Sequence, residues 1–599
     1  ISVFAPLMFL PGYIGRLFVE LAVAIAAAVA FSALLALSLS PMLASKLLRP
    51  ARGQGFLARR VDAAMGKLKS SYHASLESLL GDRRATFATI GLVIVLAAGA
   101  GGLFAVLPRE LVPEEDRGRV DLNVIAPEGA GFDYTMKAAA QVEARLQELR
   151  KDGVITRYIL GVPRFGGTQF NSGFGNANLT EGGGITSNEL AARLNRELSS
   201  ITSVRAIASV RPAFQRGGGG GGSGVDVIVA GDDYGQIAAW IKPLLAAAEA
   251  NPGLSRARLD YEPTSPRVLV NIDREKAAAL GVSAQAVGRA LESNFGTRRV
   301  TTYIKNGQEY DVLLQTDREQ RQTEQDIGNL YVRANSGELI PLSTVVTTEV
   351  RGDTPDRSRV DRLRSVTLTA QLNPGYPVGE AVKFFEAEIA KMPPGPQIKW
   401  GGMARDYLEA GSAVGLAFGM ALLLVFLVLA AQFESWIHPG VIMLTVPVAA
   451  LGGLFGLLIA GSTINTYSQI GLIILIGIAA KNGILIVEFA NQLRDEGLSI
   501  REAVIESASL RLRPIIMTSI AAAAGAIPLI MWGGAGGESR KTIGVVIFFG
   551  AIFATLLTLF IVPVFYNLLA RFTKSPQTTA RRIEAFEEAE QARAANAAE

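Results

Sequence analysis

The chain has 599 residues, of which 49% are hydrophobic and 19% are charged. This balance predicts membrane spans mixed with water-exposed domains rather than one soluble domain. The net charge of +4 is small for this length and argues against a nucleic-acid-binding surface. The lack of cysteine excludes disulfides and thiolate sites, and the two histidines, His73 and His438, argue against a zinc centre or a hydrolytic triad. We therefore expect no enzyme.

Apolar runs of about 20 residues, the length that crosses a bilayer, recur in two groups. Two of them precede a region of ordinary soluble composition at 108–405, and five follow it. The chain opens at Ile1 within another apolar stretch, so we expect residues 1–10 to be the end of a span in a fragment. The predicted spans cover 18–41, 86–107, 411–431, 437–460, 466–490, 514–532 and 542–568.

Basic residues predict the orientation of these spans. They cluster after the first full span, after the span at 466–490, and in the tail at 570–599. The positive-inside rule places these clusters in the cytoplasm and the region 108–405 outside. The short loop with Arg540 and Lys541 is then an external exception. The clusters comprise Lys46, Arg49, Arg52, Arg59 and Arg60; Arg494, Arg501, Arg511 and Arg513; and Arg571, Lys574, Arg581 and Arg582.

Residues 55–80 carry apolar side chains at helical spacing, from Leu57 to Leu76, with basic residues between them. The pattern predicts an amphipathic helix on the cytoplasmic side. Such a helix either lies on the membrane surface or packs as a linker, and the sequence leaves both open.

The external region alternates short strands and amphipathic helices, which predicts an α+β region of ferredoxin-like βαβ subdomains. Between them, Asn306-Gly307 separates two strand-like runs and predicts a hairpin. The glycine run at 217–222 superficially matches a phosphate-binding loop. It precedes a strand instead of following one, so we interpret it as a hinge.

Lys481 lies in the middle of the apolar span at 466–490. A lysine at that depth costs about 2.5–3.5 kcal/mol on insertion scales. The nearer membrane edge is roughly 13 Å away along the helix, too far for the side chain to reach. We therefore expect Lys481 to face a protein interior and to pair with a carboxylate outside this chain, as in a proton relay.

Other polar residues near this depth have two interpretations. Asn482, Thr518 and Ser519 are either part of the same relay or interhelical packing contacts. Arg511 and Arg513 precede Pro514 at the cytoplasmic mouth and are either relay members or topology signals.

Several segments resemble the resistance-nodulation-division (RND) transporters, and most closely their hydrophobe/amphiphile multidrug efflux pumps. The similarity runs from end to end in the family's order. The segments are LSLSPML at 37–43, LP at 107–108, LVPEEDRG at 111–118, QFESW at 432–436, GIAAKNGILIVEF at 477–489 and RLRPIIMTS at 511–519.

The resemblance implies a membrane α-helical bundle of twelve spans in two halves, each half with a large periplasmic loop. This chain would hold the tail of the fifth span at 1–10, the sixth at 18–41 and the whole second half, ending in the cytoplasmic tail. Its periplasmic region would comprise one porter subdomain at 108–212, a second at 213–265 and 350–405, and a docking subdomain at 266–349. The family works in the Gram-negative inner membrane as a homotrimer with a periplasmic adaptor and an outer-membrane channel, exporting hydrophobic or amphiphilic compounds in exchange for protons without a cofactor.

By position, the resemblance assigns Lys481, Arg511 and Thr518 to the proton relay, and we include Asn482 because it adjoins Lys481 and can hydrogen-bond across helices. Its acidic partners would lie on the fourth span, outside this chain. The family's deep drug pocket falls on the segment after the second porter strand. There the similarity places Tyr158 and Phe165 at aromatic pocket positions, and we expect Phe170 and Phe174 to compensate for aromatics that Pro163 and Asn176 replace. We add Leu160 to this predicted lining. The aromatics equally suit loop residues packed on the porter core.

Three alternatives remain. A metal exporter of the same family would use clustered methionines, whereas the external region has only Met136, Met392 and Met403, none of them in the pocket segment. The second is a lipid or hopanoid exporter, or a protein-export accessory of related fold, although the aromatic pocket loop and the motif match favour drugs. A membrane scaffold without transport has no reason to keep a lysine at the depth of Lys481.

Overall fold

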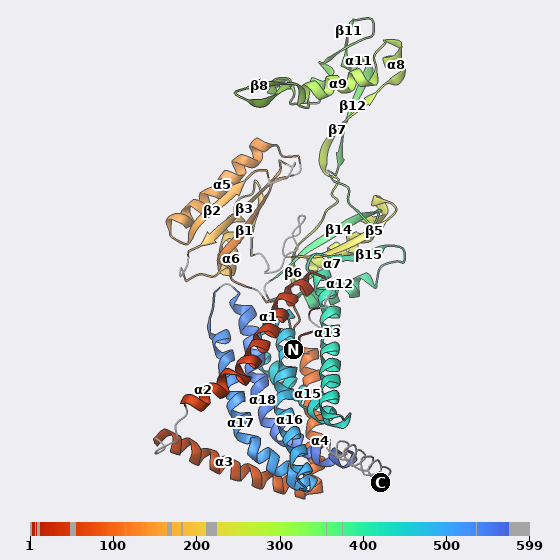
Figure 1. Ribbon diagram of the computed structural model, residues 1–599. Helices are drawn as coiled ribbons and strands as arrows, with labels where there is room; N and C mark the ends of the chain where they lie inside the picture. Colours follow the sequence, from red (N-terminus) through yellow and green to blue (C-terminus); the bar gives the residue numbers. More distant parts are fainter. Residues whose placement is uncertain are drawn as a thin grey trace, which may run out of the picture.

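The computed structural model describes residues 3–5, 8, 12–47, 56–113, 115–127, 129–163, 170–180, 184–210, 224–354, 356–373, 375–534 and 536–573. A helical bundle carries a sheet-rich region at one end, and a narrow two-stranded arm extends from that region to a further small unit (Figure 1). We call the bundle end next to the sheets the near end and the opposite end the far end. Phe165, the glycine run at 217–222 and the tail from residue 574 lie outside the described residues.

Within the described residues, seven helical segments are long and apolar enough to cross a membrane. They are Val19–Leu47, Arg83–Val106, Gly402–Phe433, Ile437–Ile459, Thr466–Asp495, Ile500–Met531 and Gly537–Phe572. The corresponding helices are α1 (Gly12–Leu37), α2 (Leu39–Leu47), α4 (Arg83–Val106), α13 (Gly402–Phe433), α14 (Ile437–Met443), α15 (Thr445–Ile459), α16 (Thr466–Asp495), α17 (Ile500–Met531) and α18 (Gly537–Leu569).

Helix α17 begins 14 residues before the apolar run predicted at 514–532. A capping box explains its start, because the Ser499 side chain accepts from the backbone of Glu502 and the Glu502 side chain accepts from the backbone of Ser499. The helix continues through Pro514. Its added turns mix apolar residues with charged and polar ones, and Ser509 and Arg513 among them contact α3 (Phe56–Gly81).

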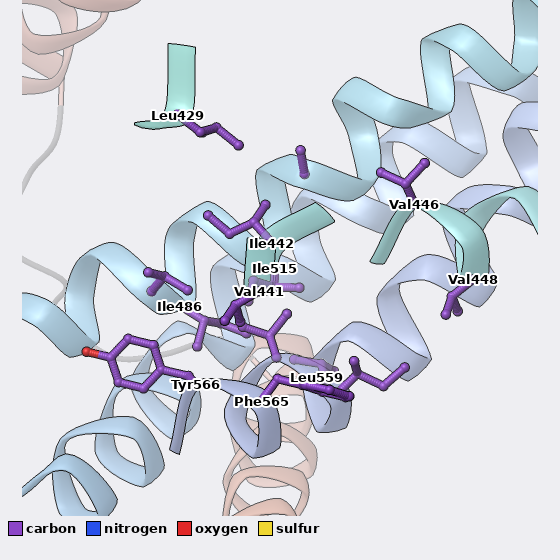
Figure 2. Packing of buried hydrophobic residues seen from close by; sticks show 14 of the residues in the cluster. Leu429, Val441, Ile442, Val446, Val448, Ile486, Ile515, Leu559, Phe565 and Tyr566 are labelled. Carbon is purple, nitrogen blue, oxygen red and sulfur yellow. The ribbon is translucent and has the colours of Figure 1, made fainter. Parts of the chain in front are cut away.

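The core of the bundle lies where α14, α16, α17 and α18 meet. Figure 2 shows Leu559 and Tyr566 of α18 close to Val441 of α14, with Ile486 of α16 beside them. All four side chains are buried, Leu559 at 6% exposure and the other three fully. A bundle core of this kind depends on van der Waals packing, because lipid tails are as apolar as leucine.

Helix α3 crosses the far end of the bundle (Figure 1). Its C-terminal half is anchored. The Tyr72 hydroxyl donates to the Leu559 carbonyl over 2.5 Å, and His73 Nδ1 lies 3.0 Å from Ser509 Oγ. In the N-terminal half, Asp62 pairs with Arg513 at 3.1 Å. Burial raises the pKa of Tyr72 far above its usual value, so this phenol stays a hydrogen-bond donor.

The first sheet unit has the chain order β1, α5, β2, β3, α6, β4 and the spatial strand order β2-β3-β1-β4, all antiparallel where pairings are given. Its helices cover one face of the sheet, where alternate residues of the strands form the core. The elements are β1 (Arg119–Ile125), α5 (Phe132–Lys151), β2 (Ile155–Gly161), β3 (Ser172–Leu179), α6 (Ser187–Leu198) and β4 (Arg205–Ser209).

The second sheet unit repeats this connectivity with an insertion between its second and third strands. Strand β6 pairs with β14, which pairs with β5, which pairs with β15. The elements are β5 (Gly224–Gly231), α7 (Tyr234–Ala250), β6 (Leu254–Leu259), β13 (Arg359–Val360), β14 (Leu363–Leu372), α12 (Val378–Ile389) and β15 (Gln397–Gly401).

The insertion leaves and re-enters through the paired strands β7 (Ser265–Ile272) and β12 (Val346–Asp353). The predicted hairpin at Asn306-Gly307 is confirmed: both residues have positive φ, and Lys305 pairs with Gln308. The other elements are α8 (Arg274–Ala279), α9 (Ala284–Asn294), β8 (Arg298–Lys305), β9 (Gln308–Leu314), η2 (Arg318–Gln320), α10 (Gln325–Gly328), β10 (Tyr331–Arg333), β11 (Leu339–Pro341) and α11 (Leu342–Val345).

Residues 108–113 with 115–116, which we call the strap, lead from α4 to β1 and tie the sheets to the bundle. The strap pairs with the loop before α16: Ile464 N donates to the Pro108 carbonyl over 2.8 Å, and Thr466 N donates to the Leu111 carbonyl over 3.1 Å. The Ser539 hydroxyl, at the start of α18, donates to the carboxylate of Glu115. Gly379 N of α12 donates to the Arg109 carbonyl, so the strap also holds the second sheet unit.

Gly452 should be required for the packing of α15 on α18. A Cβ at this position would lie 2.4 Å from Phe553 Cβ and 3.0 Å from the Phe549 carbonyl oxygen, and neither atom can move freely. We expect Gly452→Ala to lower the free energy of unfolding by roughly 1–3 kcal/mol, measured as a lower Tm in detergent. Gly525→Ala on α17 is the control, since a Cβ there meets nothing within 4 Å. Equal melting of the two variants would contradict the close α15–α18 contact.

Candidate functional site within the helical bundle

Helix α16 carries the lysine and asparagine singled out from the sequence. Its start is capped by Asn465, whose side-chain oxygen accepts from the backbone of Tyr467 and Ser468 at 3.0 Å each. Lys481 and Asn482 follow near the middle of the helix and point in different directions. Lys481 is exposed on the surface of this chain, whereas Asn482 is buried at 2% exposure.

Asn482 joins three helices through one threonine. Its Nδ2 donates to Thr555 Oγ1 of α18 over 3.2 Å. The Thr555 hydroxyl lies 2.7 Å from Ser519 Oγ of α17 and 2.7 Å from the Ala551 carbonyl of its own helix. Because a hydroxyl carries one proton, Thr555 can donate to only one of these two acceptors at a time. The arrangement is therefore a polar junction with two hydrogen-bonding states.

Two further predicted relay residues lie apart from this junction. Thr518 donates to the Ile515 carbonyl of its own helix over 3.1 Å. The Arg511 guanidinium lies 4.3 Å from the ring centroid of Phe489, and its buried Nε has no hydrogen-bond partner among the described residues. Lys481 has no ion-pair partner in the described part of the chain. The structure thus brings Asn482 together with Ser519, but not with Arg511 or Thr518.

Thr555 was missed in the sequence. It stands in an apolar run of α18 that also contains Thr558, and both side chains are buried. Threonine is common in membrane helices, because it can bond to the carbonyl four residues earlier, so its presence did not mark a site. Only the packing of α16 against α18 gives Thr555 its role.

The residues predicted to line a drug pocket do not share one surface. Tyr158 and Leu160 pack toward the core under α5 and α6, and the Tyr158 hydroxyl donates to Glu143 over 3.1 Å. Phe174 lies on β3 between positions that face that core, so it points to the opposite face of the sheet. Phe170 is 53% exposed and its ring meets Phe132 edge-on at 6.2 Å. On the side of Phe174 lies Ile159, which is 65% exposed.

A cavity of about 320 Å³ lies between the two sheet units, above the strap. Arg256 spans it: one guanidinium nitrogen donates to Gln371 Oε1 over 2.8 Å, and the other to Asn195 Oδ1 over 3.0 Å. Asn195 belongs to the first unit, and Arg256 and Gln371 to the second. Burial lowers the pKa of Arg256, and the charge of Arg205 adds to the effect. This contact is a polar bridge between the two sheet units.

The second unit passes directly into the membrane bundle at Gly402, the first residue of α13. Gly402 has φ +53°, and a Cβ there would lie 2.9 Å from Asp226 Oδ2. Asp226 accepts a hydrogen bond from the Thr369 hydroxyl over 2.7 Å. Burial raises the pKa of Asp226, although the Thr369 hydrogen bond and the charge of Arg258 oppose the shift. A half-buried carboxyl group therefore adjoins the point where a sheet becomes a span.

Apolar spanning helices, a polar junction among three of them and two sheet units tied to their near ends define a membrane protein of the transporter class. The sequence profile of the AcrB/AcrD/AcrF family matches residues 1–570. The chain therefore belongs to this family, which confirms the RND resemblance.

Curated relatives agree with this assignment. An uncharacterized transporter of Haemophilus influenzae is 32% identical over 95% of this chain and 55% of its own length. The toluene efflux pump membrane transporter TtgB of Pseudomonas putida is 30% identical over 94% of the chain and 55% of its length. The multidrug resistance protein MdtF of Escherichia coli is 30% identical over 96% and 57%. The chain thus spans about half the length of the relatives it matches.

Thr555→Val should weaken the junction, because valine keeps the shape of threonine and removes its hydroxyl. Asn482 Nδ2 and Ser519 would each lose a partner. We expect a loss of about 1 kcal/mol in the free energy of unfolding. A double-mutant cycle with Asn482→Ala, read from Tm in detergent, should show that the two losses are not additive. Thr518→Val, which removes only a bond within its own helix, is the control; strict additivity would rule out the junction.

Asp226→Asn should raise Tm at neutral pH. The raised pKa of Asp226 means that its ionised form opposes folding, so the gain is largest above that raised pKa. The gain disappears as the pH falls below the ordinary value of 3.8, where aspartate is protonated in both states. Asp273→Asn provides the contrast, because backbone hydrogen bonds from Lys276 lower the pKa of Asp273. That variant should lose stability at neutral pH. A change in Tm of the same sign for both variants would contradict the burial of Asp226.

Proposed function

We propose that this chain forms the second half of a proton-driven efflux transporter of the Gram-negative inner membrane. It exports hydrophobic and amphiphilic compounds from the periplasm and the membrane. Its family membership supports this proposal, as do relatives named for toluene efflux and multidrug resistance. In this assignment the near end of the bundle faces the periplasm and the far end faces the cytoplasm.

The observation that carries the proposal is the position of Lys481. It stands in the middle of a span with its side chain exposed among the described residues, next to the buried Asn482. Exposure of that charge to lipid would cost about 2.5–3.5 kcal/mol or more. A polypeptide of the relatives' full length has further residues that can cover this side chain. We infer that they supply carboxylates that pair with Lys481.

Protonation of such a carboxylate would break its ion pair with Lys481 and release α16 from one set of contacts. Asn482 would carry the change to α18 and α17, because the Thr555 hydroxyl can switch between Ser519 and Ala551. We assign Arg511 and Thr518 of α17 to the same relay, as residues that join it in another conformation. The near ends of α16 and α18 are bonded to the strap, so a shift of these helices would reach the sheets.

We assign the two sheet units to ferredoxin-like porter subdomains and the insertion to the docking subdomain. The shared strand order and the position of the insertion support this assignment. Substrate would meet the uncovered face of the first sheet near Phe174, Phe170 and Ile159. Tyr158 and Leu160 would shape that sheet from behind. The working assembly would be a homotrimer with a periplasmic adaptor and an outer-membrane channel.

Lys481→Ala should abolish export. The chain is placed as the second half of a transporter of the relatives' length and produced in an efflux-deficient Gram-negative host. Dye accumulation and drug susceptibility are compared for the parent and the variant at equal membrane content and equal trimer content. We expect the variant to match the empty host, because the relay loses its cation.

Lys541→Ala is the matched control, since Lys541 pairs with Glu538 near the start of α18, away from the middle of the span. It should export like the parent. If the Lys481→Ala variant exports dye and drug as well as the parent, Lys481 has a structural role and the proposed relay is wrong. If the parent itself exports no dye or drug, lipid substrates become the leading alternative.

A further inference from the structure

A second polar cluster lies at the far end of the bundle, away from Lys481. His438 of α14 is 1% exposed, and its ring stacks on Tyr566 of α18 with centroids 5.6 Å apart. The Tyr566 hydroxyl donates to Asn491 Oδ1 over 2.6 Å, and Arg494 Nη1 lies 3.3 Å from the same hydroxyl. Phe433 of α13 meets the imidazole edge-on at 5.9 Å.

This cluster contains buried polar atoms that no described protein atom satisfies. Both imidazole nitrogens of His438 lack a hydrogen-bond partner among the described residues, as does Nδ2 of Asn491. Buried polar groups in folded proteins are nearly always paired, with protein or with ordered water. Since the ring is already enclosed, a group from another chain could not reach it without displacing packed side chains.

The hydrogen-bonding chemistry of the His438 ring favours water as its partner. A neutral imidazole has one donor and one acceptor nitrogen, and a protonated imidazole has two donors. An anion can only accept and a cation can only donate. Water can do both, and it can pair with either charge state of the ring. Tyr566 and Asn491 supply the further hydrogen-bonding groups that a buried water requires.

We propose that His438 forms a hydrated proton-binding site at the far end of the bundle, through which protons leave the transporter. The passage of protons rests on the proposed function, whereas the hydrated site does not. The charged group that acts on the ring is Arg494 of α16, and Asp495 beside it acts on Tyr566. Two positive charges repel, so Arg494 disfavours a positive charge on the His438 ring.

The position of the cluster suits an exit. Thr555 and Tyr566 lie on the same face of α18, separated by about 16 Å of helix. Thr555 belongs to the junction with Asn482, and Tyr566 to the cluster with His438. The two sites therefore lie at successive depths along one helix face, the deeper one beside the proposed relay and the other near the cytoplasmic surface.

Nuclear magnetic resonance can test the site on this chain directly, because it contains only two histidines. The chain is labelled with ¹⁵N-histidine, reconstituted in lipid, and studied as the His73→Gln variant, which leaves one imidazole. We expect magnetisation transfer from water to both ring nitrogens of His438. We also expect their shifts to move from neutral imidazole towards imidazolium as the pH is lowered. If neither the magnetisation transfer nor the titration is observed while the backbone spectrum is unchanged, the proposal is overturned.

A transport measurement tests the role of the site. In the full-length transporter, His438→Gln should lower the export rate several-fold and flatten its dependence on cytoplasmic pH, while His73→Gln should change neither. An unchanged pH profile in His438→Gln would overturn the exit role even if the ring is hydrated. The Lys481→Ala variant separates the two proposals. If it exports normally, the relay is refuted. The resonance result on His438 does not depend on the relay and tests the hydrated site by itself.

Discussion

Hydrocarbon offers no hydrogen-bond partner, and the bundle is organised around that constraint. Each polar side chain within it must find protein or enclosed water, so its partners are set by which helices touch. Asn482 therefore selects Thr555, and Thr555 in turn reaches Ser519. The same constraint makes Lys481 informative, because this chain offers its charge no partner within the described residues. It also singles out the buried ring of His438, whose two nitrogens have no hydrogen-bond partner in the part of the chain that the structure describes.

The connection between bundle and sheets is made by backbone as much as by side chains. The strap forms hydrogen bonds with the loop that starts α16, and β15 runs without a loop into α13. Gly402 is needed at that second junction, because its left-handed backbone lies against Asp226 and leaves no room for a side chain. Movements of α13, α16 and α18 would therefore reach both sheet units. The bridge of Arg256 to Asn195 would resist their separation.

Some predictions succeeded because the signal was local. The Asn306-Gly307 hairpin depends on two residues that tolerate positive φ, so four residues of sequence were enough. The apolar runs coincide with helices, although α17 begins far earlier than its apolar run, since a cap and not hydropathy sets a helix start. The family recognition rested on long segments such as 477–489 and agrees with the family match over residues 1–570.

The pocket residues were harder to group, because a strand turns successive side chains to opposite faces. Tyr158 and Phe174 are close in sequence and on adjacent strands, yet helices cover one of them and not the other. Their side of the sheet depends on where α5 and α6 pack, which no local pattern states. Thr555 was overlooked for a similar reason, since its partner is 73 residues away.

The sequence by itself determined the membrane class, the family and the one lysine whose charge demands an explanation, because span length, motif order and the cost of a buried charge are properties of the chain. Only the tertiary structure decided which polar groups meet. Long-range packing put Asn482 beside Thr555, joined Arg256 to Asn195 across a cleft, and enclosed His438 against Tyr566. Hydrogen bonds act over about 3 Å, so these partnerships exist only once helices and sheets distant in sequence have packed together.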